Sequence, residues 1–212
     1  HIRQLEEDAE RRRQFLADIA HELRSPITTM RTMVGALQDG IANEPERRDR
    51  AISAISRTSE RLERLVEDLM ELAKLDLDEL PLSVKEVDLV ELLSACILSH
   101  ENRAFKSGIE LKPIQTGNPV KIIADPDRIT QIIINVIENA ISYAGSGSQV
   151  FTSIIQGDPV KIIIKDTGKG IDAKDLPFIF DTFYRVDGAR TPGNSHSGLG
   201  LSIVKKLVEA HC

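Results

Sequence analysis

The sequence has few aromatic residues and few cysteines. It contains no tryptophan, and its phenylalanines and tyrosines make up 4% of 212 residues. Proteins that bind single-stranded nucleic acid stack bases on aromatic side chains, so this scarcity argues against that class. The two cysteines, Cys96 and Cys212, have neither the spacing of metal ligands nor a disulfide-rich context, which indicates a reducing compartment. Cys96 lies in an apolar helical run and is expected in the core.

Long hydrophobic runs and an excess of positive charge are also missing. No stretch approaches about 18 consecutive apolar residues, so none is predicted to span a membrane or to act as a signal peptide. The net charge is −6 and no sustained basic stripe appears, which excludes a general nucleic-acid binder. A hydrophobic content of 41% predicts a real core, in one large domain or two modest ones.

Two long amphipathic helices are predicted in the first third of the chain. The first ends near Gln38, before Asp39-Gly40, and the second begins after Asn43-Glu44-Pro45. Both carry apolar residues alternately three and four apart, which is a heptad seam, and a short turn between such helices makes an antiparallel hairpin. The seam residues are Leu16, Ile19, Leu23, Met30, Met33 and Leu37, then Ile52, Ile55, Ser59, Leu62, Val66, Leu69 and Ala73.

Further apolar residues make both stripes wider than a two-helix contact can cover. These are Phe15, Ile27, Val34, Leu65 and Leu72. A second copy of the chain would bury the excess in a four-helix bundle, so we expect a homodimer. Residues 1–14 are highly charged and are expected to be a linker helix, either a solvated helix end or a rigid rod that carries a signal.

His21 occupies the outermost position of the first helix, where packing does not explain it. A neutral imidazole offers water a free nucleophilic nitrogen. Pro26 lies in the middle of the same helix, where it removes the hydrogen bond to the Glu22 carbonyl at a typical cost of ~3 kcal/mol. Taken alone, these residues are best explained as a solvated histidine and a tolerated bend, and an exposed nucleophile beside a kink is the functional interpretation, which depends on motifs further along the chain.

Helices and strands mix after a change of composition at 76–81. Asp88 caps a helix from Leu89 to about Phe105, Asp125-Pro126 opens another, and a last helix covers Leu199 to Ala210. Strands are expected at 109–112, 120–123, 150–155 and 160–165, the last two as a hairpin. The predicted fold class is α + α/β: a helical hairpin, then an α/β sandwich with an open, mostly antiparallel sheet and helices on one face.

Candidate ligand-binding residues are confined to this second part. Asn135 and Asn139 lie four apart on one helix, and amide oxygens suit Mg²⁺, which also binds substrate phosphates. Asp166-Thr167-Gly168-Lys169-Gly170 follows an apolar strand, where glycines admit a ligand and the carboxylate can accept a hydrogen bond from an exocyclic amine, although a simple turn also explains it. Ser197-Gly198-Leu199-Gly200-Leu201 opens a helix whose free amides suit phosphate. Residues 171–195 between them are rich in aromatics and predict a closing lid.

Five motifs in this order resemble the boxes of the sensor histidine kinases of bacterial two-component systems. They are His21-Glu22-Leu23-Arg24-Ser25-Pro26, Asn135-x-x-x-Asn139-Ala140, Asp166-x-Gly168-x-Gly170, Phe180-Asp181-x-Phe183-Tyr184-Arg185 and Gly198-Leu199-Gly200-Leu201. The resemblance covers about Phe15 to Cys212. It implies a dimerising, histidine-bearing hairpin and an ATP-binding sandwich of the kind shared with gyrase and MutL. Thr28-Thr29-Met30-Arg31 is further similar to the cell-wall-regulating sensor kinases of Gram-positive bacteria.

The resemblance also implies roles for individual residues. His21 is the implied phosphorylated nucleophile, Glu22 the base that polarises it, and Arg185 the cation that stabilises the transferring phosphoryl group. ATP and Mg²⁺ are the implied cofactors, with Asn139 as the metal ligand. The implied nucleotide contacts are Asn135, Asn139, Tyr143, Asp166, Gly168, Gly170, Gly198, Leu199 and Gly200. Related ATPases carry a glutamate where Asn135 stands, and an amide cannot activate water in its place, so ATP should be kept for His21.

The sequence departs from the family pattern at several positions. Ser142 stands where a lysine is common, and Thr182 where an arginine is common, which leaves Arg185 or Arg190 to supply the charge. Ser25 replaces the usual threonine or asparagine associated with dephosphorylation of the partner, so we expect that activity to be reduced or retained. The family normally continues beyond Cys212 into a final pair of strands.

The predicted organisation is a linker helix (1–14), a phosphotransfer hairpin (15–76), a linker (77–87) and an ATP-binding domain (88–212). The predicted function is autophosphorylation of His21, then transfer to an aspartate of a response-regulator receiver domain that docks beside it. The predicted location is the cytoplasmic portion of a membrane-anchored bacterial protein, without a nucleic-acid partner and with membrane contact only through segments absent from this chain. Two alternatives remain: a catalytically dead dimeric scaffold, if Ser142 and Thr182 disrupt phosphate handling, and a gyrase- or MutL-type ATPase, which Asn135 disfavours.

Overall fold

The computed structural model describes residues 2–41, 43–76, 81–114, 118–186 and 197–211. They form two compact units, His1–Glu71 and Leu72–Cys212. Residues 77–80 of the predicted linker and residues 187–195 of the predicted lid lie outside the described residues.

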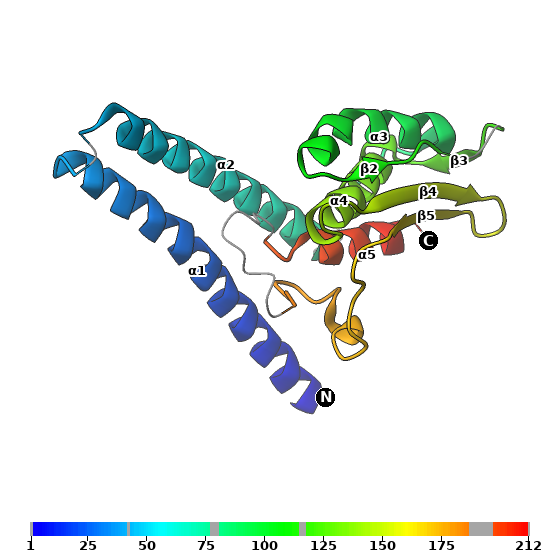
Figure 1. The fold of residues 1–212 in the computed structure, drawn as a ribbon. Coiled ribbons are helices and arrows are strands. Elements are labelled where there is room, and N and C mark those ends of the chain that lie inside the picture. The colour runs from blue at the N-terminus through cyan, green and yellow to red at the C-terminus, as the bar shows by residue number, and fades with distance from the viewer. Residues whose placement is uncertain (1, 42, 77–80, 115–117, 187–196, 212) are drawn as a thin grey trace. The chain divides into compact units, whose positions relative to one another are not determined.

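The first unit is the predicted helical hairpin, built from α1 (Ile2–Gln38) and most of α2 (Pro45–Asp76), whose last residues, from Leu72, belong to the second unit. Gly40 has a φ of +72°, which favours glycine, and the Glu44 carbonyl accepts the Arg48 N–H at 2.9 Å where α2 begins. Within this unit the two helices separate with distance from the turn (Figure 1). Ile27 and Val34 are 44% and 41% exposed, so this hairpin leaves part of its apolar surface uncovered, as predicted.

Two other members of the wide apolar stripes behave differently. Leu65 and Leu72 are 4% and 1% exposed in the single chain. They therefore add nothing to the apolar surface that a second copy could cover, and the expectation of a dimer rests on the exposed residues alone.

The second unit contains the three predicted helices, and the two predicted caps, Asp88 and Asp125, stand at the starts of two of them. α3 (Leu89–Lys106) starts after Asp88, whose carboxylate accepts the Val90 N–H at 2.9 Å. α4 (Pro126–Tyr143) starts after Asp125, and α5 (Gly200–Ala210) closes the described chain. A short 3-10 helix, η1 (Leu176–Phe178), lies between β5 and α5 in the sequence.

The strands of this unit form two sheets in the described part of the chain, where the sequence predicted one. β1 (Lys85–Asp88) pairs antiparallel with β3 (Lys121–Ala124). β4 (Gln149–Ile155) pairs antiparallel with β5 (Lys161–Asp166), the predicted hairpin, and parallel with the short β2 (Glu110–Leu111). β1 falls largely inside the predicted linker, because a four-residue strand with a single buried side chain gives almost no local pattern.

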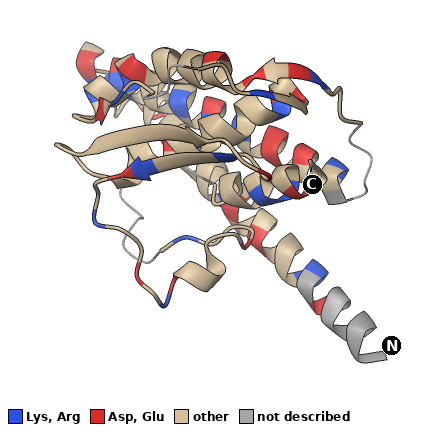
Figure 2. Ribbon diagram, turned by 90° about the vertical axis from the view of Figure 1, so that its right-hand side faces the viewer, with Lys and Arg blue, Asp and Glu red and all other residues tan. Residues whose placement is uncertain are grey.

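The core of the second unit lies between its helices and its strands. Leu93 of α3, Ile133 and Ile137 of α4, and Val150 of β4 are all fully buried. β4 and β5 lie side by side on one face of the helices, and acidic and basic residues are intermixed along the helices (Figure 2). Burying one side of α4 leaves Asn135 and Asn139 half-buried at the edge of the core.

Candidate functional site

The helix α4 joins the asparagine motif to the second glycine-rich motif. Asn135 Nδ2 donates a hydrogen bond to the carbonyl oxygen of Gly200 at 3.5 Å, across 65 residues of sequence. A Cβ atom at Gly200 would lie 3.8 Å from Asn135 Cγ, so the start of α5 is in van der Waals range of this side chain. The two motifs that were predicted to contact nucleotide therefore meet.

The loop after β5 lies against the C-terminal end of α4. Asp166 ends β5, and its Oδ1 accepts the Gly168 N–H at 2.8 Å. A Cβ atom at Gly168 would lie 2.5 Å from Ala144 Cα, a separation that real Cβ atoms essentially never show. Only glycine allows the loop to approach the residue that follows α4. The Asp166 side chain remains exposed, as an acceptor for a ligand must be.

A third contact joins the aromatic motif to the second glycine-rich motif. The Phe183 N–H donates to the Gly198 carbonyl at 3.0 Å. Both residues have positive φ, +63° and +78°, and a Cβ atom at Gly198 would lie 2.8 Å from the Phe183 carbonyl carbon. The sequence between them includes Arg190, which lies outside the described residues. This contact holds the two ends of that sequence together.

Two further predicted nucleotide contacts, Tyr143 and Leu199, differ in the exposure of their side chains. Tyr143, at the end of α4, is 36% exposed, whereas the Leu199 side chain is fully buried and can offer only its backbone to a ligand. Arg185 is half-buried and follows Tyr184, whose hydroxyl donates to Asp175 at 2.8 Å.

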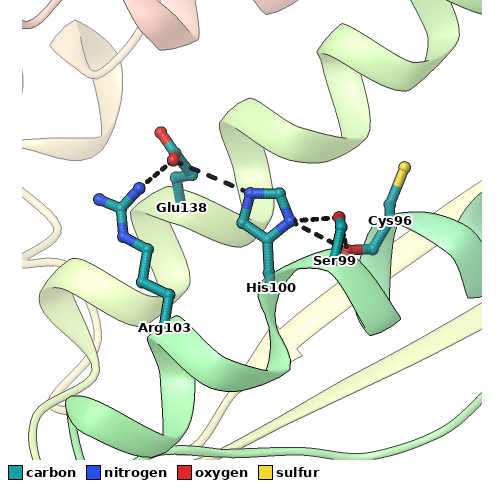
Figure 3. Close-up of polar contacts among 5 residues, drawn as sticks. All are labelled: Cys96, Ser99, His100, Arg103 and Glu138. Carbon is teal, nitrogen blue, oxygen red and sulfur yellow. Dashed lines mark hydrogen bonds and ion pairs between the residues drawn. The ribbon is translucent and has the colours of Figure 1, made fainter.

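A polar cluster braces α4 against α3 (Figure 3). Arg103 forms an ion pair with Glu138, and His100 Nε2 lies 3.9 Å from the same carboxylate oxygen. His100 Nδ1 is 2.9 Å from both the Cys96 carbonyl and the Ser99 hydroxyl. Burial raises the pKa of the Cys96 thiol, as expected for a core cysteine. Sequence reasoning missed this cluster, because only the packing of two helices brings its members together.

The first unit presents the predicted phosphoacceptor on its surface. His21 and Ser25 are both exposed on α1, one helical turn apart. Glu22 is 22% exposed and forms an ion pair across the hairpin with Arg61 of α2, at 3.7 Å. Sequence reasoning also missed Arg61, because its partner lies on the other helix of the hairpin.

The helix around His21 continues without a break through Pro26, which is buried. The hydroxyls of Thr28 and Thr29 donate to the carbonyls of Arg24 and Ser25, at 2.9 and 3.1 Å. These local bonds satisfy carbonyls next to the position where proline removes a donor.

Over the described ranges, no three or more histidine, cysteine, aspartate or glutamate side chains lie close enough together to hold a metal ion. Among the helices of the described chain, none combines the length and the apolar character that crossing a membrane requires.

Two family models match the chain. The His Kinase A (phospho-acceptor) domain matches residues 11–78, and the histidine kinase-, DNA gyrase B- and HSP90-like ATPase matches residues 124–212. The sensor histidine kinase WalK of Bacillus subtilis is 35% identical over 94% of this chain and 33% of its own length. The sensor protein kinase WalK of Staphylococcus aureus is 37% identical over 94% of this chain and 48% of its own length. The chain thus spans between a third and a half of these relatives.

Solved structures give the same result for the fold. The Acinetobacter baumannii histidine kinase AdeS superposes with a TM-score of 0.73 at 27% identity, over 90% of this chain and 86% of that one. Full-length ShkA, solved in complex with AMPPNP, superposes with a TM-score of 0.65 at 28% identity, over 93% of this chain and 41% of that one. The phosphoacceptor hairpin and the ATPase-like sandwich, in this order and with these relatives, place the chain in the family of bacterial sensor histidine kinases.

Proposed function

We propose that this chain catalyses ATP-dependent phosphorylation of its own His21 and then transfers the phosphoryl group to an aspartate of a response-regulator receiver domain. We further propose that it belongs to the cytoplasmic portion of a membrane-anchored sensor and acts as a homodimer. Membership of the family supports each of these points, and the sensor kinases to which the chain is similar are longer proteins.

The observation that carries the proposal is the convergence of three motifs around α4. Asn135 contacts Gly200, Gly168 lies against Ala144 at the C-terminal end of the helix, and Gly198 contacts Phe183. Contacts between residues that are far apart in the sequence thus bring polar groups and glycines of the motifs together in the second unit. Such an arrangement suits a nucleotide, whose phosphates need close backbone approach and whose base needs an acceptor such as Asp166.

The proposed chemistry assigns one task to each polar side chain. An imidazole nitrogen of His21 attacks the γ-phosphorus of ATP, the bond to the bridging oxygen breaks, and ADP leaves. Glu22 accepts the proton released by the ring, and Arg185 stabilises the charge on the transferring phosphoryl group. Ser25, one turn after His21, is the residue that would orient water when the regulator is dephosphorylated.

The donor set fits a magnesium ion that is bound mainly through the nucleotide. Mg²⁺ commonly uses only one or two protein ligands and completes its shell with water and phosphate oxygens. The half-buried Asn139 offers one amide oxygen, so no acidic cluster is needed. When bound, the ion would neutralise charge on the phosphates.

Labelling with γ-³²P-ATP tests the proposal. The parent protein should acquire an acid-labile label, which His21→Gln abolishes and Asn139→Ala lowers by about a hundredfold or more through lost Mg-ATP binding. Asn102→Ala is the matched control, because Asn102 is an exposed helical asparagine on α3. A parent that takes up no label would be the inert scaffold, and a parent that releases phosphate without labelling itself would be the ATPase. Either result refutes the proposal.

A further inference from the structure

The segment that joins the two glycine-rich motifs contains a chain of consecutive tight turns. Backbone N–H groups donate three residues back, from Asp175 to Asp172, Phe178 to Asp175 and Asp181 to Phe178, each at 2.9 Å, and from Tyr184 to Asp181 at 3.2 Å. In the described part of this segment, only the three residues of η1 are helical. Isolated turns of this kind are weakly stable by themselves, because each fixes several dihedral angles for one hydrogen bond. Side chains must therefore hold the segment in shape.

One hydrogen bond between side chains joins an early turn of this series to the last turn. Tyr184 Oη donates to Asp175 Oδ1 at 2.8 Å. The Tyr184 ring also packs on the ring of Phe178, with centroids 5.6 Å apart. Asp175 is only 7% exposed, so water competes little for its carboxylate. The carboxylate thus closes the chain of turns on itself.

The second oxygen of the same carboxylate accepts no hydrogen bond from the described residues. Asp175 Oδ2 is buried and has no hydrogen-bond partner among the described residues. A buried acceptor without a partner typically costs about 1–3 kcal/mol, so an apolar residue would serve stability equally well here. An aspartate at this position is therefore explained by its other oxygen, Oδ1, which holds Tyr184 in place.

The residue it holds, Tyr184, stands between two features of the candidate site. On one side is Phe183, whose strained backbone donates to Gly198. On the other is Arg185, the proposed phosphoryl-stabilising residue. A tyrosine that is fixed at its hydroxyl cannot rotate without breaking this bond, so its neighbours keep their places as well.

We infer that Asp175 is a positioning residue of the kinase: by accepting the hydrogen bond of Tyr184 it fixes Arg185 beside the phosphates that Gly198 and Gly200 contact. The inference rests on the proposed function, since Arg185 matters only if a phosphoryl group is transferred. It predicts that the loss of the bond slows the transfer more than it weakens the binding of ATP.

The test compares variants of the whole chain in single-turnover labelling with γ-³²P-ATP. Asp175→Ala and Tyr184→Phe should each lower the rate constant of His21 phosphorylation at saturating ATP by about tenfold or more, while the apparent KM for ATP changes by less than about threefold. Asp175→Asn keeps an acceptor for the hydroxyl and should stay within about threefold of the parent. The double variant Asp175→Ala/Tyr184→Phe should be no slower than the slower single variant, because both remove one bond.

Asp172→Ala is the matched control. Its carboxylate lies on the same segment but is 76% exposed, and it forms an ion pair with the equally exposed Lys174 at 3.8 Å. It should label at the parent rate. Parent rates in both Asp175→Ala and Tyr184→Phe, strictly additive losses, or a raised KM at an unchanged rate constant would each overturn the inference. If Asp175→Ala does not fold, the conservative pair decides: Tyr184→Phe must be slow and Asp175→Asn must not. If the parent protein does not label His21, the proposed function itself is refuted. The inference about Asp175 is tested separately, by comparing the variants with a parent that does label.

Discussion

Glu22 is the residue on which two different interactions converge. It is the proposed base for the neighbouring His21, and it forms an ion pair with Arg61 at 3.7 Å. Both side chains keep contact with water, at 22% and 31% exposed, and pairs of this kind contribute about 0–1 kcal/mol. The ion pair is therefore weak enough for Glu22 to exchange Arg61 for the imidazole of His21.

Glu22→Gln separates these two roles. An amide cannot accept the imidazole proton, so the rate of His21 phosphorylation should fall by about a hundredfold, and the affinity for Mg-ATP should not change. Arg61→Gln removes the same ion pair but leaves the base, and it should stay within about threefold of the parent. Labelling rates and equilibrium nucleotide binding measure both effects. An equally slow Arg61→Gln would show that the ion pair, and not a base, supports the reaction.

Gly168 is a second residue at which the structure leaves no room for a larger side chain. A methyl group there would lie 2.5 Å from Ala144 Cα and 2.8 Å from Ala144 O, so the backbone must shift. Gly168→Ala should lower the free energy of unfolding by about 1–3 kcal/mol and weaken ATP binding measurably. Gly157→Ala is the control, since its new methyl group would meet only Pro159 O, at 3.5 Å. Equal stability and equal ATP affinity in the two variants would contradict the close approach of the loop to α4.

At the scale of elements, the start of α4 depends on one buried carboxylate. Asp125 Oδ1 accepts the N–H groups of Asp127 and Arg128, and Oδ2 accepts that of Ser83 at 2.8 Å. Burial by itself would raise the pKa of Asp125, but these backbone donors outweigh it and hold the pKa below its ordinary value of 3.8. The ionised cap is therefore worth more to the folded chain than to the unfolded one.

Asp125→Ala should consequently destabilise the protein in a pH-dependent way. Because the folded pKa is lowered, the contribution of the carboxylate is fully present above pH 3.8 and is lost as the pH falls through the folded value. Loss of the cap should cost about 1–2 kcal/mol at neutral pH, and the difference from the parent should shrink below the ordinary pKa. Urea unfolding across this range measures it. A difference that stays constant with pH would show that the charge of Asp125 is irrelevant.

Whether an element could be predicted depended on how local its causes are. α3 and α4 were predicted at their starts because Asp88 and Asp125 cap them through neighbouring N–H groups. β1 was missed, whereas β2 falls inside the strand predicted at 109–112. The pairing of β1 with β3 and the parallel pairing of β2 with β4 could not be predicted, because no local pattern specifies the partners of such short strands. For the same reason the motif residues could be named from the sequence, whereas Arg61, Glu138 and Asp175 emerged only from their tertiary contacts.

At the scale of the whole molecule, the distribution of exposed apolar side chains distinguishes the first unit. Scattered exposed apolar residues are normal for any protein, but a repeated series along one pair of helices marks an interface. The members with more than two fifths of their surface exposed include Leu16, Ile27, Val34, Ile52, Val66 and Met70. They continue the seams of a hairpin whose helices separate away from the turn (Figure 1).

These residues predict a dimer that forms through the first unit. Burying an isoleucine or valine side chain contributes about 1.5 kcal/mol or more, and a symmetric interface counts each substitution twice. The double variant Ile27→Glu/Val34→Glu should therefore weaken association by several orders of magnitude and give monomers at micromolar concentration, as measured by sedimentation equilibrium. Leu98→Glu places one such charge on an apolar residue of α3 that is 70% exposed, and it should leave the dimer intact. A parent that sediments as a monomer would refute the dimer. Dissociation by Leu98→Glu to the same extent would refute the assignment of the interface to the hairpin, because added charge would then weaken the dimer wherever it is placed.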